Sequence, residues 1–263
     1  MKKIVNLNGY TALITGACSG IGLAYTKQLA SMHCNVVMVD VNPAVNQVVN
    51  DINREFGVDA YPVNIDLADS MSAQKIYDDL QQKGICVDIL VNNAGMFYFK
   101  ELILLPVSKV EAMLRLHIET TTKLTYLFGR DMCHRQKGYV LNMASICADM
   151  PNPGLTMYAA TKAYIKTFSK SMWYEFADYG VGVTCVSPGG VATGLYKVED
   201  KWIKLGLKLG VLVSPEYIAK HAVKAMLKKR KHTIPKCMLN GFFVWLVNAI
   251  PTPLRMYFKR KVI

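Results

Sequence analysis

Short, largely apolar runs alternate along this chain with longer stretches of helical character. Such runs, apolar at consecutive rather than alternate positions, predict strands that are buried on both faces of a sheet. Strands that alternate with helices predict a parallel sheet covered by helices on both sides. The expected fold class is therefore α/β, with a single doubly wound parallel sheet. The predicted strands are 12–15, 35–39, 60–66, 89–92, 139–143 and 182–187, with a seventh near 232–235.

The late part of the chain contains a clear helix start. Ser214 is followed by Pro215, and Ser is a favoured N-cap while Pro fits the first helical position. The helix is expected to run through Leu227 and to end in the basic residues 228–231, where positive charge suits the helix dipole. The chain has 263 residues without an internal repeat or long linker, which favours one domain with one large core.

A glycine-rich turn joins the first predicted strand to a helical stretch. Residues 16–22 read GACSGIG, and glycines at this position let the backbone approach a pyrophosphate closely. The following helix N-terminus offers unpaired N–H groups and a partial positive charge. The spacing is GxxxGxG rather than GxGxxG, so the turn alone is a weak sign of dinucleotide binding.

Asp40 ends the second apolar run, eighteen residues after Gly22. An acid near this separation can accept hydrogen bonds from the adenosine ribose hydroxyls, and it repels a 2′-phosphate. Neither Cys18 nor Val41 supplies a cation that would bind such a phosphate. The sequence therefore favours NAD(H), with NADP(H) as the alternative.

Three polar residues have the chemistry of a proton-transfer site. Tyr158 and Lys162 are four residues apart, so on a helix they share a face, and Ser145 lies thirteen residues upstream. A phenol is a poor base at neutral pH, but a neighbouring cation favours the phenolate. A hydroxyl partner can hydrogen-bond the reacting oxygen. The trio can exchange a proton with an alcohol or a ketone, provided that another group moves the hydride.

Taken together, these pieces resemble the short-chain dehydrogenase/reductase family. The likeness runs from about residue 8 to about residue 235, with every block in the family order and spacing. Each block alone is a weak match, whereas the ordered set is very specific. The blocks are TGACSGIG at 15–22, NIDL at 64–67, NNAG at 92–95, Ser145, YAATK at 158–162 and PGGVAT at 188–193.

The resemblance implies a Rossmann-like domain over 1–235, which includes a substrate lid at about 194–213, and an apolar and basic extension over 236–263. It implies that Tyr158 is the acid/base, that Ser145 orients the substrate oxygen, and that Lys162 tunes the phenol and holds the nicotinamide ribose. It also implies dimers or tetramers. The residues expected to bind the cofactor are Gly16, Ser19, Gly20, Ile21, Gly22, Asp40, Asp66, Leu67, Asn93, Ala94, Gly95, Tyr158, Lys162, Pro188, Gly189, Val191 and Thr193.

One position departs from the family pattern. The family usually has an Asn in the helix after NNAG, where it helps to relay protons to the lysine, and alignment places His117 there. We include His117 among the candidate catalytic residues, because an imidazole can carry protons near neutral pH. The alternative is a hydrogen-bonded helix residue without a role in proton transfer.

The formal net charge of +12 is confined to the last quarter of the chain. Residues 1–196 hold sixteen basic and sixteen acidic residues, whereas residues 197–263 hold fifteen basic and three acidic ones. Nucleic acid is a poor explanation, because no binding motif accompanies the charge. Basic residues in this region can instead steer an anionic substrate such as an acyl thioester or a bile acid.

The apolar run 238–250 is followed by four basic residues between 255 and 261, and it is shorter than the ~20 residues of a spanning helix. Three interpretations remain open. The run packs on the substrate cleft or a partner subunit, it makes peripheral contact with an anionic membrane, or it has no role. The default location is the cytoplasm, with membrane association as the alternative, since the sequence shows no secretory signal.

The remaining residues exclude some classes of site. The seven cysteines have no CxxC pair, which fits a reducing compartment, and the five histidines show no metal-ligand spacing. We therefore predict no metal site.

Apolar residues expected to wall the substrate cleft are Met96, Phe97, Tyr98, Met150, Pro151, Leu155 and Leu195.

The sequence thus predicts an NAD(P)(H)-dependent oxidoreductase that interconverts a secondary alcohol and a ketone. The expected substrate is a small hydrophobic molecule such as a steroid, a long-chain ketone or an acyl ketone. One rival is a 3-oxoacyl-carrier reductase. The other is a non-catalytic protein that senses a dinucleotide or associates with a membrane.

Overall fold

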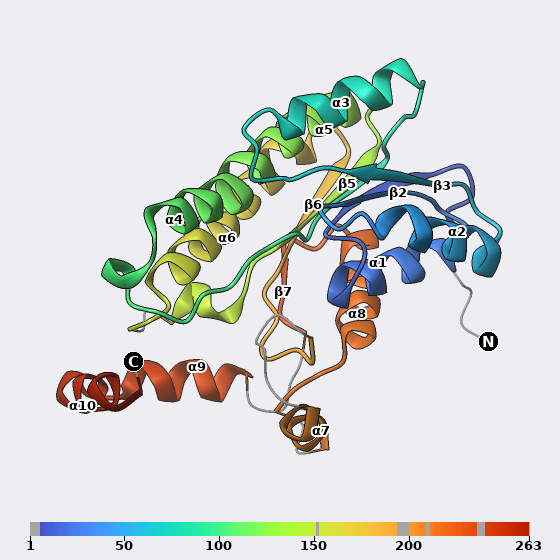
Figure 1. The fold of residues 1–263 in the computed structure, drawn as a ribbon. Helices are drawn as coiled ribbons and strands as arrows, with labels where there is room; N and C mark the ends of the chain where they lie inside the picture. Colours follow the sequence, from blue (N-terminus) through green and yellow to red (C-terminus); the bar gives the residue numbers. More distant parts are fainter. Residues whose placement is uncertain (1–5, 151–152, 194–199, 209–210, 236–239, 263) are drawn as a thin grey trace.

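The computed structural model describes residues 6–150, 153–193, 200–208, 211–235 and 240–262. Within these ranges seven strands form one sheet in the order β3-β2-β1-β4-β5-β6-β7, and all neighbouring pairs are parallel (Figure 1). The predicted α/β class and single doubly wound sheet are confirmed. The strands are β1 (Thr11–Thr15), β2 (Asn35–Asp40), β3 (Ala60–Asn64), β4 (Ile89–Asn92), β5 (Gly138–Met143), β6 (Val181–Val186) and β7 (His232–Thr233).

Helices cover both faces of the sheet (Figure 1). One layer contains α1 (Gly20–Ala30), α2 (Val45–Phe56) and α8 (Pro215–Leu227). The other contains α3 (Ser72–Gln82), α4 (Val107–Leu114), α5 (Thr121–His134) and α6 (Thr156–Ala177). Three further helices, α7 (Asp200–Lys208), α9 (Asn240–Ala249) and α10 (Thr252–Val262), lie beyond the sheet. Short turns are η1 (Leu102–Leu104), the π-helical η2 (Arg115–Thr120) and η3 (Ile146–Asp149).

Two apolar cores, one on each side of the sheet, explain why the strand sequences are continuously hydrophobic. In β1, Ala12 and Ile14 pack toward α1 and α8, whereas Leu13 packs into the second core with residues of α3 and α5. All three side chains are completely buried. Because successive side chains of a strand point to opposite faces, a strand covered on both faces needs apolar residues at every position.

The predicted helix at Ser214 is present as α8. The Ser214 hydroxyl accepts a hydrogen bond from the backbone N–H of Tyr217 at 3.2 Å, and Pro215 occupies the first turn. The basic residues after α8 precede β7, so they lie at the amino end of the sheet. There, the Lys229 ammonium donates to the Gly180 carbonyl at 2.6 Å and the Lys231 ammonium donates to the Tyr174 hydroxyl at 2.7 Å.

The third strand ends earlier than its apolar pattern suggests. β3 stops at Asn64, whereas the prediction extended it to Asp66. The Asp66 carboxylate accepts a hydrogen bond from the N–H of Ala68 at 2.8 Å, and the Asp66 carbonyl accepts one from Asp69 at 3.1 Å. These bonds form a turn that carries the chain away from the sheet.

Parts of the predicted lid and extension are described. Helix α7 lies within the lid range 194–213, whose residues 194–199 and 209–210 lie outside the described residues. The extension contains α9 and α10, and its first residues, 236–239, are also not described. The domain boundary at residue 235 and the role of the lid remain predictions.

No helix in the described part of the chain combines the length and hydropathy required to cross a bilayer. In the same ranges, no group of three or more His, Cys, Asp or Glu side chains is placed to hold a metal ion.

Candidate active site

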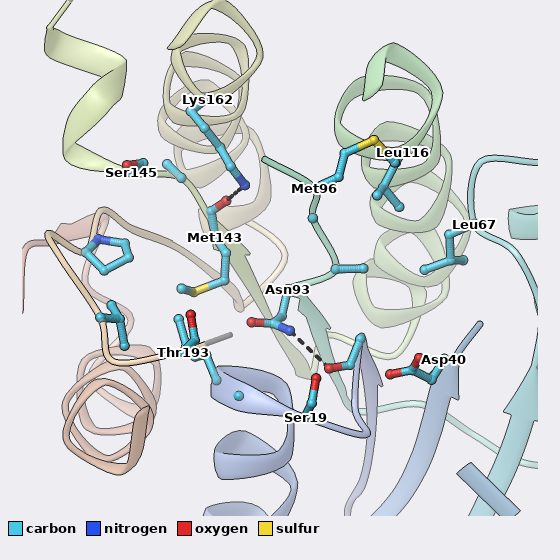
Figure 2. Close-up of a pocket in the computed structure, with 18 of the residues that line it drawn as sticks. Ser19, Asp40, Leu67, Asn93, Met96, Leu116, Met143, Ser145, Lys162 and Thr193 are labelled. Carbon is cyan, nitrogen blue, oxygen red and sulfur yellow. Dashed lines mark hydrogen bonds between the residues drawn. The ribbon is translucent and has the colours of Figure 1, made fainter. Parts of the chain in front are cut away.

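The sheet order reverses between β1 and β4, which are neighbours in space although β2 and β3 intervene in the sequence. Ligands of open α/β sheets bind outside the carboxyl ends of the strands at such a point. A cleft of about 590 Å³ lies there, and Figure 2 shows part of its lining. The predicted residues that line it are Gly16, Ser19, Gly20, Ile21, Asp40, Asp66, Leu67, Asn93, Ala94, Gly95, Ser145, Tyr158, Lys162, Pro188, Gly189, Val191 and Thr193.

Gly22 is a predicted cofactor residue that does not line the cleft. A Cβ atom added to Gly22 would lie 1.8 Å from the carbonyl oxygen of Gly16 and 2.7 Å from the Asn93 side-chain nitrogen. Gly22 therefore allows the first turn of α1 to pack against the glycine turn. Gly16, with a φ of +66°, and Gly20, with a φ of +52°, adopt backbone conformations that favour glycine.

The Asp40 carboxylate is held by backbone groups on both oxygens. Its Oδ2 accepts a hydrogen bond from the Cys18 N–H, and its Oδ1 accepts one from the Asn42 N–H, both at 2.9 Å. The first bond ties the end of β2 to the glycine turn. Asp40 therefore presents a fixed negative charge at one end of the cleft (Figure 2).

Asn93 connects the first and fourth strands at the floor of the cleft. Its side-chain amide donates to the Thr15 carbonyl at 2.9 Å and to the Gly16 carbonyl at 3.4 Å, and the latter bond is drawn in Figure 2. Its backbone N–H donates to the Thr15 hydroxyl at 2.9 Å. Asn93 thus holds the glycine turn in position with its side chain.

The structure brings Ser145, Tyr158 and Lys162 to the same cleft. Figure 2 shows Ser145 and Lys162 at the end away from Asp40. Ser145 follows β5, while Tyr158 and Lys162 are on one face of α6. All three are buried. The Ser145 Oγ accepts a hydrogen bond from the Cys147 N–H at 3.1 Å, so its own hydroxyl hydrogen can be donated to a substrate oxygen. The phenyl ring of Phe97 packs edge-on against the Tyr158 ring, with centroids 4.9 Å apart.

Lys162 is a buried cation. Its Nζ donates to the Met143 carbonyl at 2.8 Å and lies 5.7 Å from the centre of the Tyr158 ring. Burial lowers the pKa of Lys162 to about 8. This pKa lies below the value of 10.5 for lysine in an unfolded chain. Between pH 8 and 10.5 the folded protein therefore binds fewer protons at Lys162 than the unfolded chain, and its stability rises with pH in that window. Below pH 8 the buried charge costs stability, which is typical of a functional rather than a structural residue.

His117 is completely buried behind the cleft, in the π-helical turn η2. Its Nε2 accepts a hydrogen bond from the Met96 N–H at 3.0 Å, so Nδ1 carries the hydrogen and donates to the Thr161 hydroxyl at 2.8 Å. That hydroxyl donates in turn to the Tyr158 carbonyl at 3.0 Å. Burial, together with the charge of Lys162, holds the pKa of His117 well below its ordinary value, so the ring is neutral at pH 7.

Several lining residues were not predicted from the sequence. Val41 directly follows Asp40, Ile65 precedes Asp66, and Leu116 precedes His117, so each is next to a predicted position. The others, Met143 and Ala144, continue β5 into Ser145. Their apolar side chains are indistinguishable from core residues in the sequence. Only the fold brings them to the cleft, Leu116 from η2 and the others from the ends of strands.

Two of the predicted substrate walls lie at or beside the cleft. Met96 lines the cleft, and Phe97 contacts Tyr158. Met150 is buried at the end of η3. Pro151 and Leu195 lie outside the described residues.

Comparison with known proteins identifies the family. Residues 10–204 match the family model described as short chain dehydrogenase. The chain is 32% identical over 225 residues to the very-long-chain 3-oxoacyl-CoA reductase of Homo sapiens. The aligned residues cover 83% of this chain and 69% of that protein. It is 30% identical over 277 aligned positions to the human inactive hydroxysteroid dehydrogenase-like protein 1. That alignment covers 96% of this chain and 79% of that protein.

A solved structure of a 7β-hydroxysteroid dehydrogenase has the same fold. It superposes with a TM-score of 0.83 at 23% sequence identity, and the match covers 97% of this chain and 96% of that chain. The likeness at this identity concerns the fold alone. The family model, the ordered sequence blocks and the sheet agree, and the chain belongs to the short-chain dehydrogenase/reductase family.

Proposed function

We propose that this protein interconverts a secondary alcohol and a ketone with a nicotinamide dinucleotide. The observation that carries the proposal is that Ser145, Tyr158 and Lys162 line the same cleft as the glycine turn and Asp40. This arrangement supports a site in which a proton-transfer group and a dinucleotide share one cavity. Either feature alone would be compatible with a structural role or with binding only.

The residues present fit a dinucleotide. The glycine turn leaves a cradle that side chains would fill, since a Cβ added to Gly20 would lie 3.3 Å from the Thr193 methyl group. Helix α1 begins at Gly20, so its N-terminal N–H groups face the position of a pyrophosphate. Asp66 and Leu67 would flank the adenine, and Pro188, Gly189, Val191 and Thr193 would lie at the nicotinamide end.

The proposed mechanism assigns one task to each of the three polar residues. When bound, the nicotinamide supplies or accepts the hydride. The Tyr158 phenol gives a proton to the substrate oxygen during ketone reduction and takes it back during alcohol oxidation. The Ser145 hydroxyl donates a hydrogen bond to the same oxygen, and the Lys162 ammonium favours the phenolate and holds the ribose.

The fixed carboxylate of Asp40 favours NAD(H) over NADP(H). It can accept hydrogen bonds from the ribose hydroxyls, whereas a 2′-phosphate at this place would meet a like charge. Cys18 and Val41, its neighbours at this end of the cleft, carry no cation.

A hydrophobic substrate suits the apolar residues Met96, Leu116 and Met143 in the cleft. The name of the human reductase points to a 3-oxoacyl thioester, and the excess of basic residues would attract such an anion.

A non-catalytic role is the second candidate, because another relative is named an inactive protein. The intact set of Ser145, Tyr158 and Lys162 argues against it. Cytoplasmic location and assembly into a homo-oligomer are further proposals from the sequence.

A substrate screen tests the proposed function. Purified protein would be assayed with NADH and NADPH against long-chain 3-oxoacyl thioesters, ketosteroids and short-chain ketones. We expect oxidation of NADH with a hydrophobic ketone, at a kcat/KM at least about tenfold above that for a short-chain ketone, because one buried methylene contributes about 1–3 kcal/mol. A preference for NADPH with acyl-carrier substrates would favour the carrier reductase. Tight dinucleotide binding without turnover of any substrate would favour the non-catalytic candidate.

We further propose that His117 positions the active site. The neutral imidazole joins the loop at Met96 to Thr161, which lies between Tyr158 and Lys162 on α6. Both ring nitrogens are already bonded to groups that do not titrate, whereas the relay role predicted from the sequence requires a nitrogen that changes its proton.

Substitution of His117 separates the two roles. For His117→Ala we expect kcat to fall about tenfold, because the loss of two buried hydrogen bonds loosens the catalytic helix. His117→Gln retains an amide group that can bond the Met96 N–H, and it should restore part of the activity. The pH–rate profile should keep its shape in both variants, since both ring nitrogens are bonded to groups that do not titrate. A profile whose apparent pKa values move on substitution would support the relay instead.

A further inference from the structure

The C-terminal hairpin (residues 240–262) consists of α9, a short turn and α10, and α9 contacts the protein beside the candidate active site. The Asn248 side-chain amide donates to the Asp149 carbonyl at 2.9 Å. The Asp149 carboxylate is in turn paired with Lys166 of α6 at 2.5 Å. Asp149 ends η3, the turn that follows Ser145. The hairpin is therefore anchored to the same segment that carries Ser145.

A single arginine fixes the two helices of the hairpin to each other. The Arg255 guanidinium donates to the carbonyls of Val247 at 2.7 Å, Asn248 at 2.8 Å and Ile250 at 2.9 Å. Val247 and Asn248 belong to the last turn of α9 and Ile250 follows it, so the cation also complements the helix dipole. The hairpin thus presents a defined surface, and Figure 1 shows it extending from the body on the same side as α7.

The hairpin exposes large apolar side chains rather than burying them. Trp245 is 64% exposed and Leu246 is 45% exposed on α9, and Leu254, Met256 and Tyr257 of α10 are 44%, 42% and 51% exposed. Among the described side chains of the two helices, none is fully buried. Large apolar side chains exposed on two successive helices indicate a site of interaction, because their contact with water is unfavourable.

The charge of this region is uniformly positive. After Glu216 the chain contains no Asp or Glu, and α10 alone carries Arg255, Lys259, Arg260 and Lys261. Apolar and basic side chains on one short helix match the boundary between acyl chains and anionic headgroups. A second copy of this chain is a poor partner, since a symmetric contact would oppose two positive surfaces.

We propose that the C-terminal hairpin docks on an anionic lipid surface and lies in the headgroup region. The helices have ten and eleven residues, about half of the ~20 that span a bilayer. Trp245, Leu246 and the exposed apolar residues of α10 enter the acyl boundary, while Arg260 and Lys261 meet the phosphates. Because the hairpin is joined to η3, docking brings the lipid surface next to the cleft. The delivery of a hydrophobic substrate from the lipid would depend on the proposed function, but the docking itself does not.

Vesicle flotation of the full chain tests the proposal without any measurement of turnover. The probes are vesicles of phosphatidylcholine alone and of phosphatidylcholine with about one third phosphatidylserine. We expect at least about tenfold stronger binding to the anionic vesicles, and weaker binding at 0.5 M salt than at 0.05 M, because salt screens the attraction. Binding to neither kind of vesicle, or equal binding to both, would overturn the proposal.

Two pairs of substitutions locate the surface. Arg260→Glu with Lys261→Glu changes the charge of the hairpin, and Lys228→Glu with Arg230→Glu makes the same change at the amino end of the sheet. The hairpin variant should lose at least about tenfold in vesicle binding, and the control variant should lose much less. Equal losses would show attraction by net charge only and would contradict the proposal.

A third variant tests the apolar contact. Trp245→Glu with Leu246→Glu should also abolish flotation, while circular dichroism and the melting temperature stay near those of the unmodified protein, because both side chains are exposed. Unchanged flotation of this variant would contradict the proposal. So would sedimentation that shows a hairpin-dependent dimer of a protein that does not bind vesicles.

Discussion

Replacement of Tyr158 by Phe is expected to lower kcat by about 10²–10⁴-fold, which is the usual contribution of a positioned acid or base. The variant removes one oxygen from a cleft whose other polar residues remain in place. Phe also keeps the edge-on contact with Phe97. Steady-state kinetics with the best ketone from the substrate screen would measure kcat, and fluorescence titration with NADH would show nearly unchanged affinity.

Tyr164→Phe is the matched control. Tyr164 is on the same helix, and its hydroxyl is bonded to the Thr122 hydroxyl at 2.8 Å, outside the residues that line the cleft. It should keep kcat within about a factor of two, since only a partly buried hydrogen bond is lost. Normal turnover by Tyr158→Phe would disprove the proposed mechanism. A similar loss of kcat in both variants would point to a general disturbance of α6.

The second large effect is expected at the adenosine end of the cleft. Asp40→Asn removes the negative charge that disfavours a 2′-phosphate, and Val41→Arg adds a cation at an exposed position beside it. We expect the double variant to shift the ratio of kcat/KM for NADPH over NADH by about 10²-fold or more, and the single Asp40→Asn by about tenfold, because each 1.4 kcal/mol corresponds to a factor of ten. Kinetics with both cofactors at a fixed ketone concentration would measure the ratio.

Asp51→Asn provides the control for this charge change. Asp51 lies on α2, is exposed and contacts Arg54 at 3.5 Å. Its replacement alters the net charge by the same amount without contact with the cleft, so the cofactor ratio should not change. The proposed role of Asp40 would be wrong if the unmodified protein preferred NADPH, or if neither Asp40 variant altered the ratio.

Much of the fold follows from local sequence patterns. The predicted apolar runs correspond to the strands of the sheet, because strands covered on both faces must be apolar at successive positions. The start of α8 follows from Ser214 and Pro215, whose preference for a helix N-terminus depends only on the neighbouring backbone. The end of β3 did not follow, since Asp66 forms a turn that competes with the sheet.

The residues of the glycine turn and the pair on α6 follow from spacing, because both are local arrangements, whereas Asp66, Asn93 and Pro188 follow only from the resemblance to the family. Their convergence was not visible in the sequence. It depends on the sheet order, which brings β1 and β4 together and places the residues that follow β5 and β6 at the same edge. Likewise, the packing role of Gly22 is set by the Gly16 carbonyl, six residues earlier in the chain and in contact with it only in the folded turn.

Sequence alone therefore determined the class of fold, the strands, the glycine turn and the proton-transfer residues, since their patterns depend on near neighbours in the chain. Tertiary structure decided what His117 and the C-terminal residues can do. The tautomer and neutral state of His117 are set by Met96, Thr161 and burial, and these partners come from separate segments. Trp245 and Leu246 of the apolar run near the C-terminus are exposed because α9 contacts the body mainly at η3, with no second layer to cover them among the described residues.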